Sequence, residues 1–285
     1  MQIHTKISSL KSVLSASGRV AFVPTMGNLH EGHLSLMRAA RAYGDVVVSS
    51  IFVNRLQFGP GEDFERYPRT LEEDCSKLES ANVDHLFAPE EAELYPQPQN
   101  FFIQPGSFYD SILEGACRPG HFSGVATVVA KLFNIVRPDV ALFGKKDYQQ
   151  LIILRNMVRE LNMPIRVLGC GTIRETDGLA LSSRNAYLVP EERADAHRLY
   201  AVLNEVVQRI VAGELNFERL EKWAEEQLRS YNWQPDYVAI RRQEDLQTPS
   251  PSDALVVLGA ARLGNSRLID NIEVSHEKFE SRVSA

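Results

Sequence analysis

Short apolar runs alternate with amphipathic segments along about the first 170 residues of the chain. Five runs predict strands, at 20–24, 45–53, 83–88, 140–143 and 165–169. They are almost continuously apolar, which is typical of strands buried on both faces of a parallel sheet. Helical patterns lie between them, at 34–43, 70–81, 122–137 and 147–162. This alternation predicts an α/β fold over residues 1–173, a doubly wound parallel sheet of Rossmann-like type, whose ligands gather beyond the carboxyl ends of the strands.

The pattern changes after about residue 173. A long helix is expected from Pro190 through Val211, with Glu191 and Glu192 in its first turn, where the helix dipole favours them. A second helix is expected at 216–229, strands at 236–241, 254–262 and 267–274, a loop at 247–252 and a loose tail at 277–285. We therefore expect residues 174–285 to form a smaller α+β domain that acts as a lid.

Composition narrows the class of protein. The 285 residues carry a formal net charge of −6, which argues against a general nucleic-acid binder but leaves room for a local basic pocket. No apolar run approaches the length of a membrane span, and the N-terminus lacks a signal-peptide pattern. Cys75, Cys117 and Cys170 lie far apart and have neither zinc-ligand nor disulfide-framework spacing. We expect a cytoplasmic protein with reduced thiols.

The most informative segment is 24–33 (PTMGNLHEGH), between the first predicted strand and a helical pattern. A helix N-terminus presents unpaired N–H groups and the positive end of the dipole, which suits a phosphate. Gly32 leaves room for a nucleotide near the backbone, and His30 and His33 can donate to phosphate oxygens. Taken alone, the segment is also compatible with two surface histidines at a helix cap.

Polar side chains also follow the second predicted strand. Asn54 and Gln57 carry amides that suit a small ligand with hydroxyl and carboxylate groups, although a plain polar loop explains them as well. Further on, Thr70 and Glu73 have the spacing of a capping box at the start of a helix.

Three more segments carry candidate chemistry. In 115–125, Arg118 and His121 are placed to reach an anion or a neighbouring subunit, and a hydrogen-bonded loop histidine explains His121 equally well. In 144–150, a glycine and two lysines at a strand-to-helix turn suit a phosphate, with one of the lysines expected to be a solvated surface charge. In 177–185, two serines and an arginine beside an Asp-Gly turn suit a polyphosphate, although a serine-rich linker would explain this segment if it stood alone.

Together these segments resemble the pantoate–β-alanine ligase family (the pantothenate synthetases), within the HIGH-motif nucleotidylyltransferase superfamily. The matching segments are 24–33 (PTMGNLHEGH), 67–70 (YPRT), 118–125 (RPGHFSGV), 144–150 (GKKDYQQ) and 181–185 (LSSRN). Their order and spacing hold across about residues 1–190, whereas the C-terminal part fits in length and pattern but carries fewer diagnostic residues.

The resemblance implies a two-step reaction. (R)-Pantoate and ATP give pantoyl adenylate and pyrophosphate, and the amine of β-alanine then displaces AMP to give pantothenate, a step in coenzyme A biosynthesis. It also implies magnesium with the ATP and a cytoplasmic homodimer. The net charge and the apolar run lengths separately predict a protein that binds neither nucleic acid nor membrane.

The resemblance further implies roles for individual residues. His33 is the expected proton donor, His30 assists at the phosphates, and Lys146 and Arg184 complete the catalytic set. Gln57, Gln150 and Asn54 are expected to bind pantoate. The expected nucleotide-binding residues are Met26, Gly27, Asn28, Leu29, His30, Glu31, Gly32, His33, Gly144, Lys145, Lys146, Asp147, Ile173, Leu181, Ser182, Ser183 and Arg184. Asp74 matches a position that can help with magnesium and pyrophosphate, and the metal ligands stay open.

One position departs from the family. Arg55 stands where the family usually has a proline after the asparagine, and arginine releases the constraint that proline places on the backbone. We expect an active enzyme with a looser loop.

Two other functions remain to be weighed. One is a nucleotidylyltransferase that releases an adenylylated product, disfavoured because Gln57 and Gln150 suit a small hydroxy acid. The other is a non-catalytic nucleotide- or RNA-binding module, disfavoured by the net charge and by the retained histidines, Lys146 and Arg184.

Overall fold

The computed structural model describes residues 1–274 and divides into two compact units. Unit 1 comprises Met1–Lys145 and Gln149–Gly171, and unit 2 comprises Lys146–Tyr148 and the chain from Thr172 onward. The sequence-based boundary at 173/174 lies close to this division. It did not anticipate that the short segment Lys146–Tyr148 groups with unit 2. The tail expected at 277–285 lies outside the described residues.

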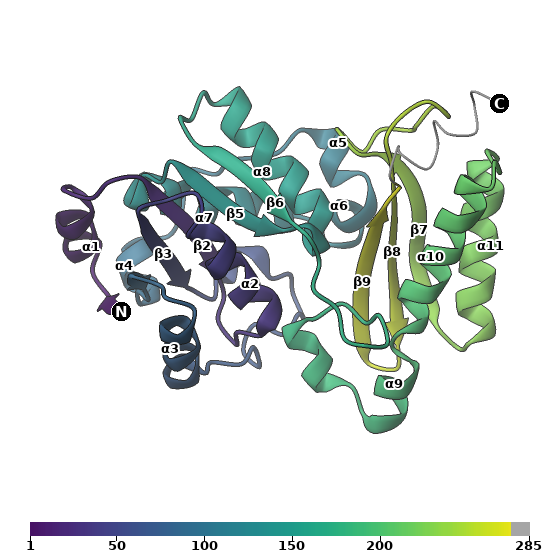
Figure 1. Cartoon of the computed structure of the whole chain (residues 1–285), viewed down its shortest axis with the longest axis horizontal. Coiled ribbons are helices and arrows are strands. Elements are labelled where there is room, and N and C mark those ends of the chain that lie inside the picture. The colour runs from purple at the N-terminus through teal and green to yellow at the C-terminus, as the bar shows by residue number, and fades with distance from the viewer. Residues whose placement is uncertain (275–285) are drawn as a thin grey trace. The chain divides into compact units, whose positions relative to one another are not determined.

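Unit 1 is built on a six-stranded parallel sheet in the order β1-β4-β3-β2-β5-β6 (Figure 1). Its strands are β1 (Gln2–His4), β2 (Val20–Thr25), β3 (Val46–Ile51), β4 (His85–Phe87), β5 (Val140–Gly144) and β6 (Arg166–Cys170). The α/β fold and its five expected strands are confirmed. β1 was not predicted, because a three-residue strand is too short to show a period.

The helices that the sequence predicted in unit 1 are present, together with shorter ones that it did not reveal. The predicted helices are α2 (Glu31–Ala40), α3 (Leu71–Ser80), α7 (His121–Val136) and α8 (Tyr148–Glu160). The additional elements are α1 (Ile7–Leu14), α4 (Glu91–Leu94), α5 (Ser107–Asp110), α6 (Leu113–Cys117) and the 3₁₀ turns η1 (Arg55–Gln57) and η2 (Lys145–Asp147). One-turn helices carry too few positions to show helical periodicity.

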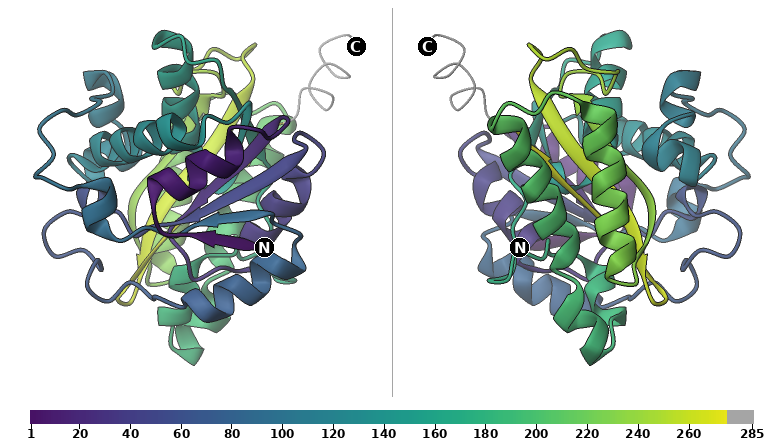
Figure 2. Two further views of the ribbon diagram at one scale, coloured as in Figure 1. Left: turned by 90° about the vertical axis from the view of Figure 1, so that its left-hand side faces the viewer. Right: turned by 90° about the vertical axis from the view of Figure 1, so that its right-hand side faces the viewer.

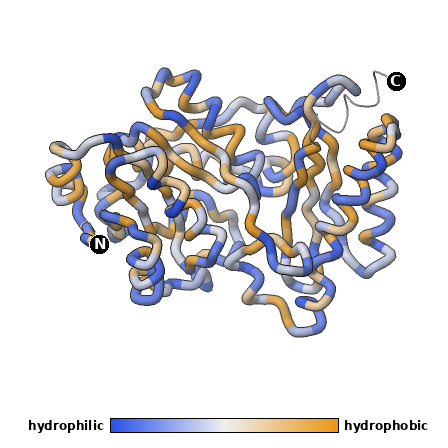
Figure 3. The backbone as a smooth tube through the Cα atoms, in the orientation of Figure 1, coloured by the Kyte–Doolittle hydropathy of each residue, from blue (hydrophilic) through white to orange (hydrophobic). Residues whose placement is uncertain are grey.

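The apolar run of β2 is explained by burial on both faces of the sheet. Phe22 packs in the cluster that contains α1, α7 and α8 side chains, whereas Ala21 and Val23 pack in the cluster built with α2 and α3. All three side chains are fully buried. The apolar colouring of the central strands in Figure 3 follows from this double coverage.

The sheet order places a topological switch point at β2. This strand pairs with β3 on one side and with β5 on the other, so the chain winds in opposite directions from it. Segments that follow β2 and β5 consequently leave the sheet side by side, which is where doubly wound folds bind ligands. The 24–33 segment follows β2, and Gly144 ends β5.

Unit 2 contains a three-stranded antiparallel sheet, β7 (Gln234–Arg242), β8 (Leu255–Leu263) and β9 (Ser266–Glu273). Helices α10 (Arg198–Val211) and α11 (Phe217–Ser230) pack against it (Figure 2, right). The single helix expected from Pro190 through Val211 is wrong. The chain forms α9 (Pro190–Asp195) and then α10, because the Ala196 N–H bonds only three residues back, to Arg193 O, and the buried stripe begins at Leu199.

Candidate active site

The loop after β2 has a backbone that only a few residue types adopt easily. Gly27 and Asn28 have φ angles of 86° and 49°, in the left-handed region that favours glycine and asparagine. Thr25 Oγ1 accepts the Gly27 N–H at 3.2 Å and donates to Ser50 O at 2.7 Å. The loop is thereby tied to the neighbouring strand β3.

A buried carboxylate holds the same loop from the other side. Asp74 Oδ2 accepts the Asn28 N–H at 2.8 Å, and its Oδ1 accepts the Leu29 N–H at 2.7 Å. Asp74 is 0% exposed, and Thr70 Oγ1 donates to it at 3.1 Å. Sequence analysis placed Asp74 near magnesium and pyrophosphate, whereas the structure places its carboxylate beneath the loop. The amides of Asn28 and Leu29 are consequently used by the protein itself.

The capping box expected from Thr70 and Glu73 is wrong, although Thr70 does occupy the N-cap position of α3. The Thr70 hydroxyl donates to Asp74, and the Glu73 carboxylate lies 3.9 Å from Lys77 Nζ. The Thr70 hydroxyl is thus turned toward the Asp74 carboxylate, with which it forms a charge-assisted bond, and the Glu73 carboxylate lies toward Lys77.

His30 and His33 stand at the start of α2, with ring centroids 4.0 Å apart. The His30 backbone N–H donates to His33 Nδ1 at 3.3 Å. An accepting Nδ1 carries no proton, so the neutral His33 ring carries its proton on Nε2. The helical bonds begin with the N–H groups of His33 and Leu34, both donating to His30 O, so the amides of Glu31 and Gly32 precede them.

The other predicted residues of this motif differ in whether their side chain or only their backbone is accessible to a ligand. Leu29 is 2% exposed and packs in the core, so only its backbone is available to a ligand. The Glu31 carboxylate is exposed and pairs with Arg38 on the same helix. Met26 lies at the loop's beginning, where Gln57 Nε2 donates to its Sδ at 3.0 Å. This contact joins the loops that follow β2 and β3.

Asn54 and Gln57 differ in burial. Asn54 is 1% exposed, and its Nδ2 donates to Gln57 Oε1 and to Gly124 O, both at 3.1 Å. Tyr95 donates its hydroxyl to Asn54 Oδ1 at 2.9 Å. The Asn54 amide is therefore committed to protein partners, while Gln57 is half-buried at the surface of the loop.

The segment 118–124 binds the loop that carries Gln57. Sequence analysis had not decided between an anion site and a structural role for this segment. His121 Nδ1 donates to Gln57 O at 2.8 Å, and Arg118 donates to His121 Nε2 at 3.1 Å. Burial, with the positive charge of Arg118, lowers the pKa of His121 to about 4, so the ring is neutral near pH 7. Arg118 also forms two 2.7 Å bonds to the Glu62 carboxylate. A Cβ on Gly124 would lie 2.2 Å from Leu56 O, so only glycine fits there.

The end of β5 supplies Gly144 and Lys145, followed in α8 by Gln149 and Gln150. Gln149 is 3% exposed and binds the backbone of Tyr109, Ile112 and Glu114. Gln150, which sequence analysis assigned to pantoate, is half-buried. Two adjacent glutamines thus have different environments, and the predicted one is the more accessible.

The predicted residues from Ile173 to Arg184 lie on a hairpin and the turn after it. Leu181 N–H donates to Ile173 O at 3.0 Å, and Gly178, with a φ of 98°, makes the predicted Asp-Gly turn. Ser182 caps the 3₁₀ turn η3 (Ser183–Tyr187) by accepting the Arg184 N–H at 3.3 Å. The hairpin therefore presents Leu181, Ser182, Ser183 and Arg184 on one short, capped segment.

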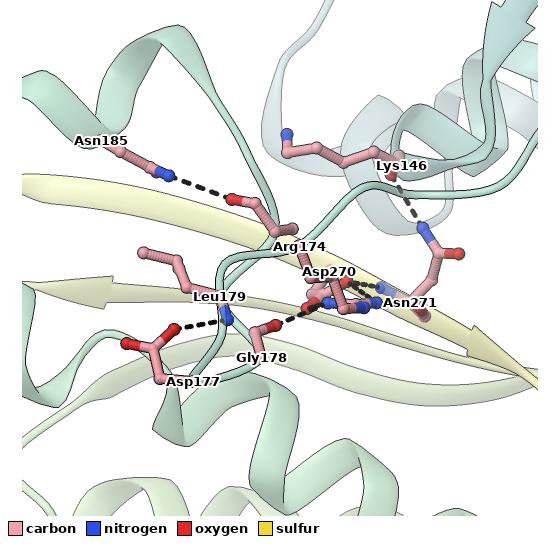
Figure 4. Close-up of polar contacts among 9 residues, drawn as sticks. Lys146, Arg174, Asp177, Gly178, Leu179, Asn185, Asp270 and Asn271 are labelled. Carbon is pink, nitrogen blue, oxygen red and sulfur yellow. Dashed lines mark hydrogen bonds and ion pairs between the residues drawn. The ribbon is translucent and has the colours of Figure 1, made fainter. Parts of the chain in front are cut away.

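A polar network on β9, which sequence analysis missed, anchors this hairpin and the Lys146 segment (Figure 4). Arg174 binds both carboxylate oxygens of Asp270, at 2.6 and 2.9 Å, and also donates to Asn271 O. Asn271 Nδ2 donates to Lys146 O at 2.8 Å. Adjacent polar residues, Asp270 and Asn271, inside an apolar strand pattern were the available signal.

The described residues, 1–274, contain no group of three or more His, Cys, Asp and Glu side chains placed to share a metal ion. Within the same range, no helix has the length and apolar character needed to cross a membrane. Unit 1 carries imidazole, amide and ammonium donors, and unit 2 carries ammonium and guanidinium donors. Each set suits an anionic ligand with several oxygens.

Comparisons with known proteins agree with this chemistry. A family model described as pantoate-beta-alanine ligase matches residues 2–273. A pantothenate synthetase of Nitrosospira multiformis is 56% identical over 279 residues, which cover 98% of this chain and 100% of the relative.

Solved structures are similar over the same length. A pantothenate synthetase of Thermus thermophilus has 48% identity and a TM-score of 0.90, covering 96% of this chain and 99% of that one. A pantoate-beta-alanine ligase of Francisella tularensis, complexed with "Beta-gamma ATP" and β-alanine, has 34% identity and a TM-score of 0.81, covering 96% and 97%.

Proposed function

The chain belongs to the pantoate–β-alanine ligase family, and we propose how its residues divide the reaction of that family. The protein is an enzyme that condenses pantoate with β-alanine at the expense of ATP. The finer proposal is that the pantoate carboxylate oxygen bonds to the α-phosphorus of ATP while the bond to pyrophosphate breaks. The amine of β-alanine then attacks the acyl carbon, loses a proton, and releases AMP.

The observation that carries the assignment of His33 is its hydrogen bond from the His30 backbone, which leaves the ring proton on Nε2. We assign His33 the donation of a hydrogen bond or proton to the nucleotide's phosphates, with His30 assisting. Negative charge accumulates on the phosphate oxygens as pyrophosphate departs, and positioned donors stabilise such charge more than water does. The amides of Glu31 and Gly32 and the positive end of α2 support the same oxygens.

We propose that unit 1 also supplies the pantoate-binding amides, Gln57 and Gln150. Pantoate has one carboxylate and two hydroxyl groups, and carboxamides match both because each has donors and an acceptor. Asn54, which sequence analysis placed in this set, is assigned a positioning role, since its amide is spent on protein partners. Gly144 and Lys145 are proposed to contact the nucleotide.

We propose that unit 2 supplies the remaining nucleotide-binding groups. Lys146 and Arg184 are assigned to the phosphates as positive charges, with Ser182 and Ser183 as hydroxyl donors and Leu181 on the same segment. Asp147 is assigned to the nucleotide, and the backbone near Ile173 to adenine. The lid role expected for this unit stays a prediction. Small-angle scattering tests it by comparing the radius of gyration with and without ATP and pantoate.

We propose that magnesium enters the site as the Mg–ATP complex, bound by the phosphates of ATP. This agrees with the lack of a three-residue acidic or imidazole cluster within residues 1–274. Phosphate oxygens and water are ligands that magnesium prefers, so no dedicated protein cage is needed. Bound there, the ion withdraws charge from the phosphates.

We also propose a cytoplasmic homodimer. The three cysteines, Cys75, Cys117 and Cys170, form no disulfide among the described residues, which fits a reducing compartment. Light scattering of the purified protein tests the dimer, since a mass near the 32.0 kDa of one chain would contradict it.

The function is tested by supplying ATP, magnesium, pantoate and candidate amines while AMP and pyrophosphate are monitored. AMP formation is expected only when both pantoate and β-alanine are present. Release of an adenylylated product without an amine would favour the nucleotidylyltransferase alternative. Binding of ATP with no AMP or pyrophosphate formed, whether or not pantoate is present, would favour a non-catalytic module.

A further inference from the structure

Tyr95, the residue that follows α4, begins a chain of hydrogen bonds that leads to Gln57. Its hydroxyl donates to Asn54 Oδ1 at 2.9 Å, and Asn54 Nδ2 donates to Gln57 Oε1 at 3.1 Å. The Asn54 side chain is almost completely buried. These bonds connect two residues that lie far apart in the sequence, and they pass through one carboxamide.

The carbonyl of Gly124 decides which way the Asn54 amide is turned. Gly124 O lies 3.1 Å from Asn54 Nδ2, and a backbone carbonyl only accepts hydrogen bonds. If the amide turned over, Asn54 Oδ1 would face Gly124 O and Gln57 Oε1, three acceptors with no hydrogen between them. The amide nitrogen must therefore face Gly124 and Gln57, and the buried Oδ1 must receive its hydrogen from Tyr95.

The orientation of Gln57 follows from that of Asn54. Its Oε1 is used as the acceptor for Asn54, so its Nε2 points the other way, where it donates to Met26 Sδ at 3.0 Å. A thioether sulfur is a weak acceptor. A carboxylate or hydroxyl oxygen of a ligand replaces it with a gain in hydrogen-bond strength, because charged and oxygen acceptors bind more strongly.

We propose that Tyr95 and Asn54 are positioning residues that hold the Gln57 carboxamide as a hydrogen-bond donor toward an oxygen of the acid substrate. The inference rests on the proposed role of Gln57 in binding pantoate. It accounts for the half-buried Tyr95 and the buried Asn54 amide next to the apolar core. A donor-only group discriminates in favour of acids and against ligands that present an N–H at the same place.

Two further features of Tyr95 agree with this role. Burial, together with the negative charge of Glu91, raises the pKa of the Tyr95 phenol, so the hydroxyl keeps its proton and remains a donor. The ring itself packs 6.0 Å from Phe52, and Lys131 Nζ lies 4.5 Å from its centroid. Tyr95→Phe retains these ring contacts and removes the hydroxyl alone.

The first experiment compares Tyr95→Phe with Tyr109→Phe. The control also loses a bond between a phenol and a carboxamide in unit 1, that from Asn156 Nδ2 to Tyr109 Oη at 2.6 Å. We expect Tyr95→Phe to raise the KM for pantoate about tenfold, because the buried Asn54 Oδ1 then loses its donor and the Asn54 amide no longer holds Gln57 in one orientation. The KM for ATP is expected to stay within about twofold of the wild-type value in Tyr95→Phe. Tyr109→Phe is expected to change neither the KM for pantoate nor the KM for ATP.

A double-variant cycle separates positioning from general destabilisation. The value of kcat/KM for pantoate is measured for Tyr95→Phe, Gln57→Leu and the double variant, with thermal unfolding of each. If Tyr95 acts through Gln57, its substitution has no further effect once Gln57 is leucine. The same loss in both backgrounds, or no loss in Tyr95→Phe, overturns the inference.

The cycle also distinguishes this inference from the function on which it rests. An unchanged kcat/KM for pantoate in Gln57→Leu overturns the role proposed for Gln57 and, with it, the positioning role of Tyr95. A large loss of kcat/KM in Gln57→Leu with none in Tyr95→Phe leaves the pantoate-binding proposal intact and overturns only the positioning role of Tyr95.

Discussion

The carboxylate of Asp74 accepts the backbone N–H of Leu29 at 2.7 Å, which ties the first turn of α3 to the loop that carries the histidines. Its second oxygen accepts the N–H of Asn28, whose left-handed backbone it stabilises. This buried side chain anchors the loop opposite the Thr25 contacts, so the position of His30 and His33 also depends on a residue outside the motif.

Replacing Asp74 by asparagine should misplace this loop. Asparagine keeps one acceptor oxygen but turns an NH₂ group toward a backbone N–H, and a buried donor pair of this kind costs about 1–3 kcal/mol. We expect kcat/KM for ATP to fall about tenfold or more and the melting temperature to drop by several degrees. Glu73→Gln, at the exposed neighbour, is the control. Wild-type kinetics in Asp74→Asn would show that the loop does not need this anchor.

Substitutions at His33 should separate the roles of its two ring nitrogens. His33→Ala is expected to lose most activity and remain folded. Glutamine places an amide N–H near the position of Nε2, whereas asparagine reproduces the accepting position of Nδ1 that binds His30 N–H. We expect His33→Gln to retain more AMP formation than His33→Asn. The reverse order would indicate that the ring matters for loop structure and not for the phosphates, and normal rates in His33→Ala would remove it from the mechanism.

Arg55→Pro should keep or improve the affinity for pantoate. Asn54 already has φ −86° and ψ 108°, in the extended region that a following proline requires. The Arg55 guanidinium lies 3.2 Å from Glu65 and 4.0 Å from the centre of the Phe64 ring, and such an exposed pair contributes about 1 kcal/mol at most. The KM for pantoate is the measurement, and a large loss of kcat/KM would contradict the expectation.

Asn271→Asp should affect the nucleotide through Lys146. Aspartate has the shape of asparagine but cannot donate to Lys146 O, so the segment that carries the lysine loses an anchor and gains a nearby negative charge. We expect the KM for ATP to rise about tenfold, with a smaller change for pantoate. Asn216→Asp is the matched control, because either residue caps a helix, as Asn216 does for α11. Equal KM values for the two variants would argue against a role for Asn271.

Acid should weaken unit 1 through His121. Its folded-state pKa, about 4, lies below the usual value of 6.5, so the unfolded chain takes up the proton first as the pH falls. The stability is complete above about pH 6.5 and is lost toward pH 4, at up to about 1.4 kcal/mol per pH unit. His121→Asn keeps a donor near Gln57 O but does not titrate. Melting temperatures from pH 7 to 4 should fall less steeply for this variant, and identical slopes would exclude His121 as the cause.

The periodicity of apolar residues determined the larger elements. Five strands and four helices of unit 1 were predictable because their length shows a period, and the run at 20–24 required burial on both faces. Local pattern failed where the outcome depended on a few hydrogen bonds. The break between α9 and α10 depends on the Ala196 N–H bonding to Arg193 O, and the absent capping box depends on the Thr70 hydroxyl turning to Asp74. Sequence spacing does not show which of several possible partners a polar group will bond.

The sequence by itself also determined the chemistry of the candidate residues, since the types His30, His33, Gln57 and Lys146 follow from motif and resemblance. Only the tertiary structure decided how each is held. Asp74, Tyr95, His121 and Asn271 act on residues 45, 41, 64 and 125 positions away, Leu29, Asn54, Gln57 and Lys146 respectively. Hydrogen bonds between such distant positions leave no periodic trace in the chain, because they depend on which strands and loops the fold brings together.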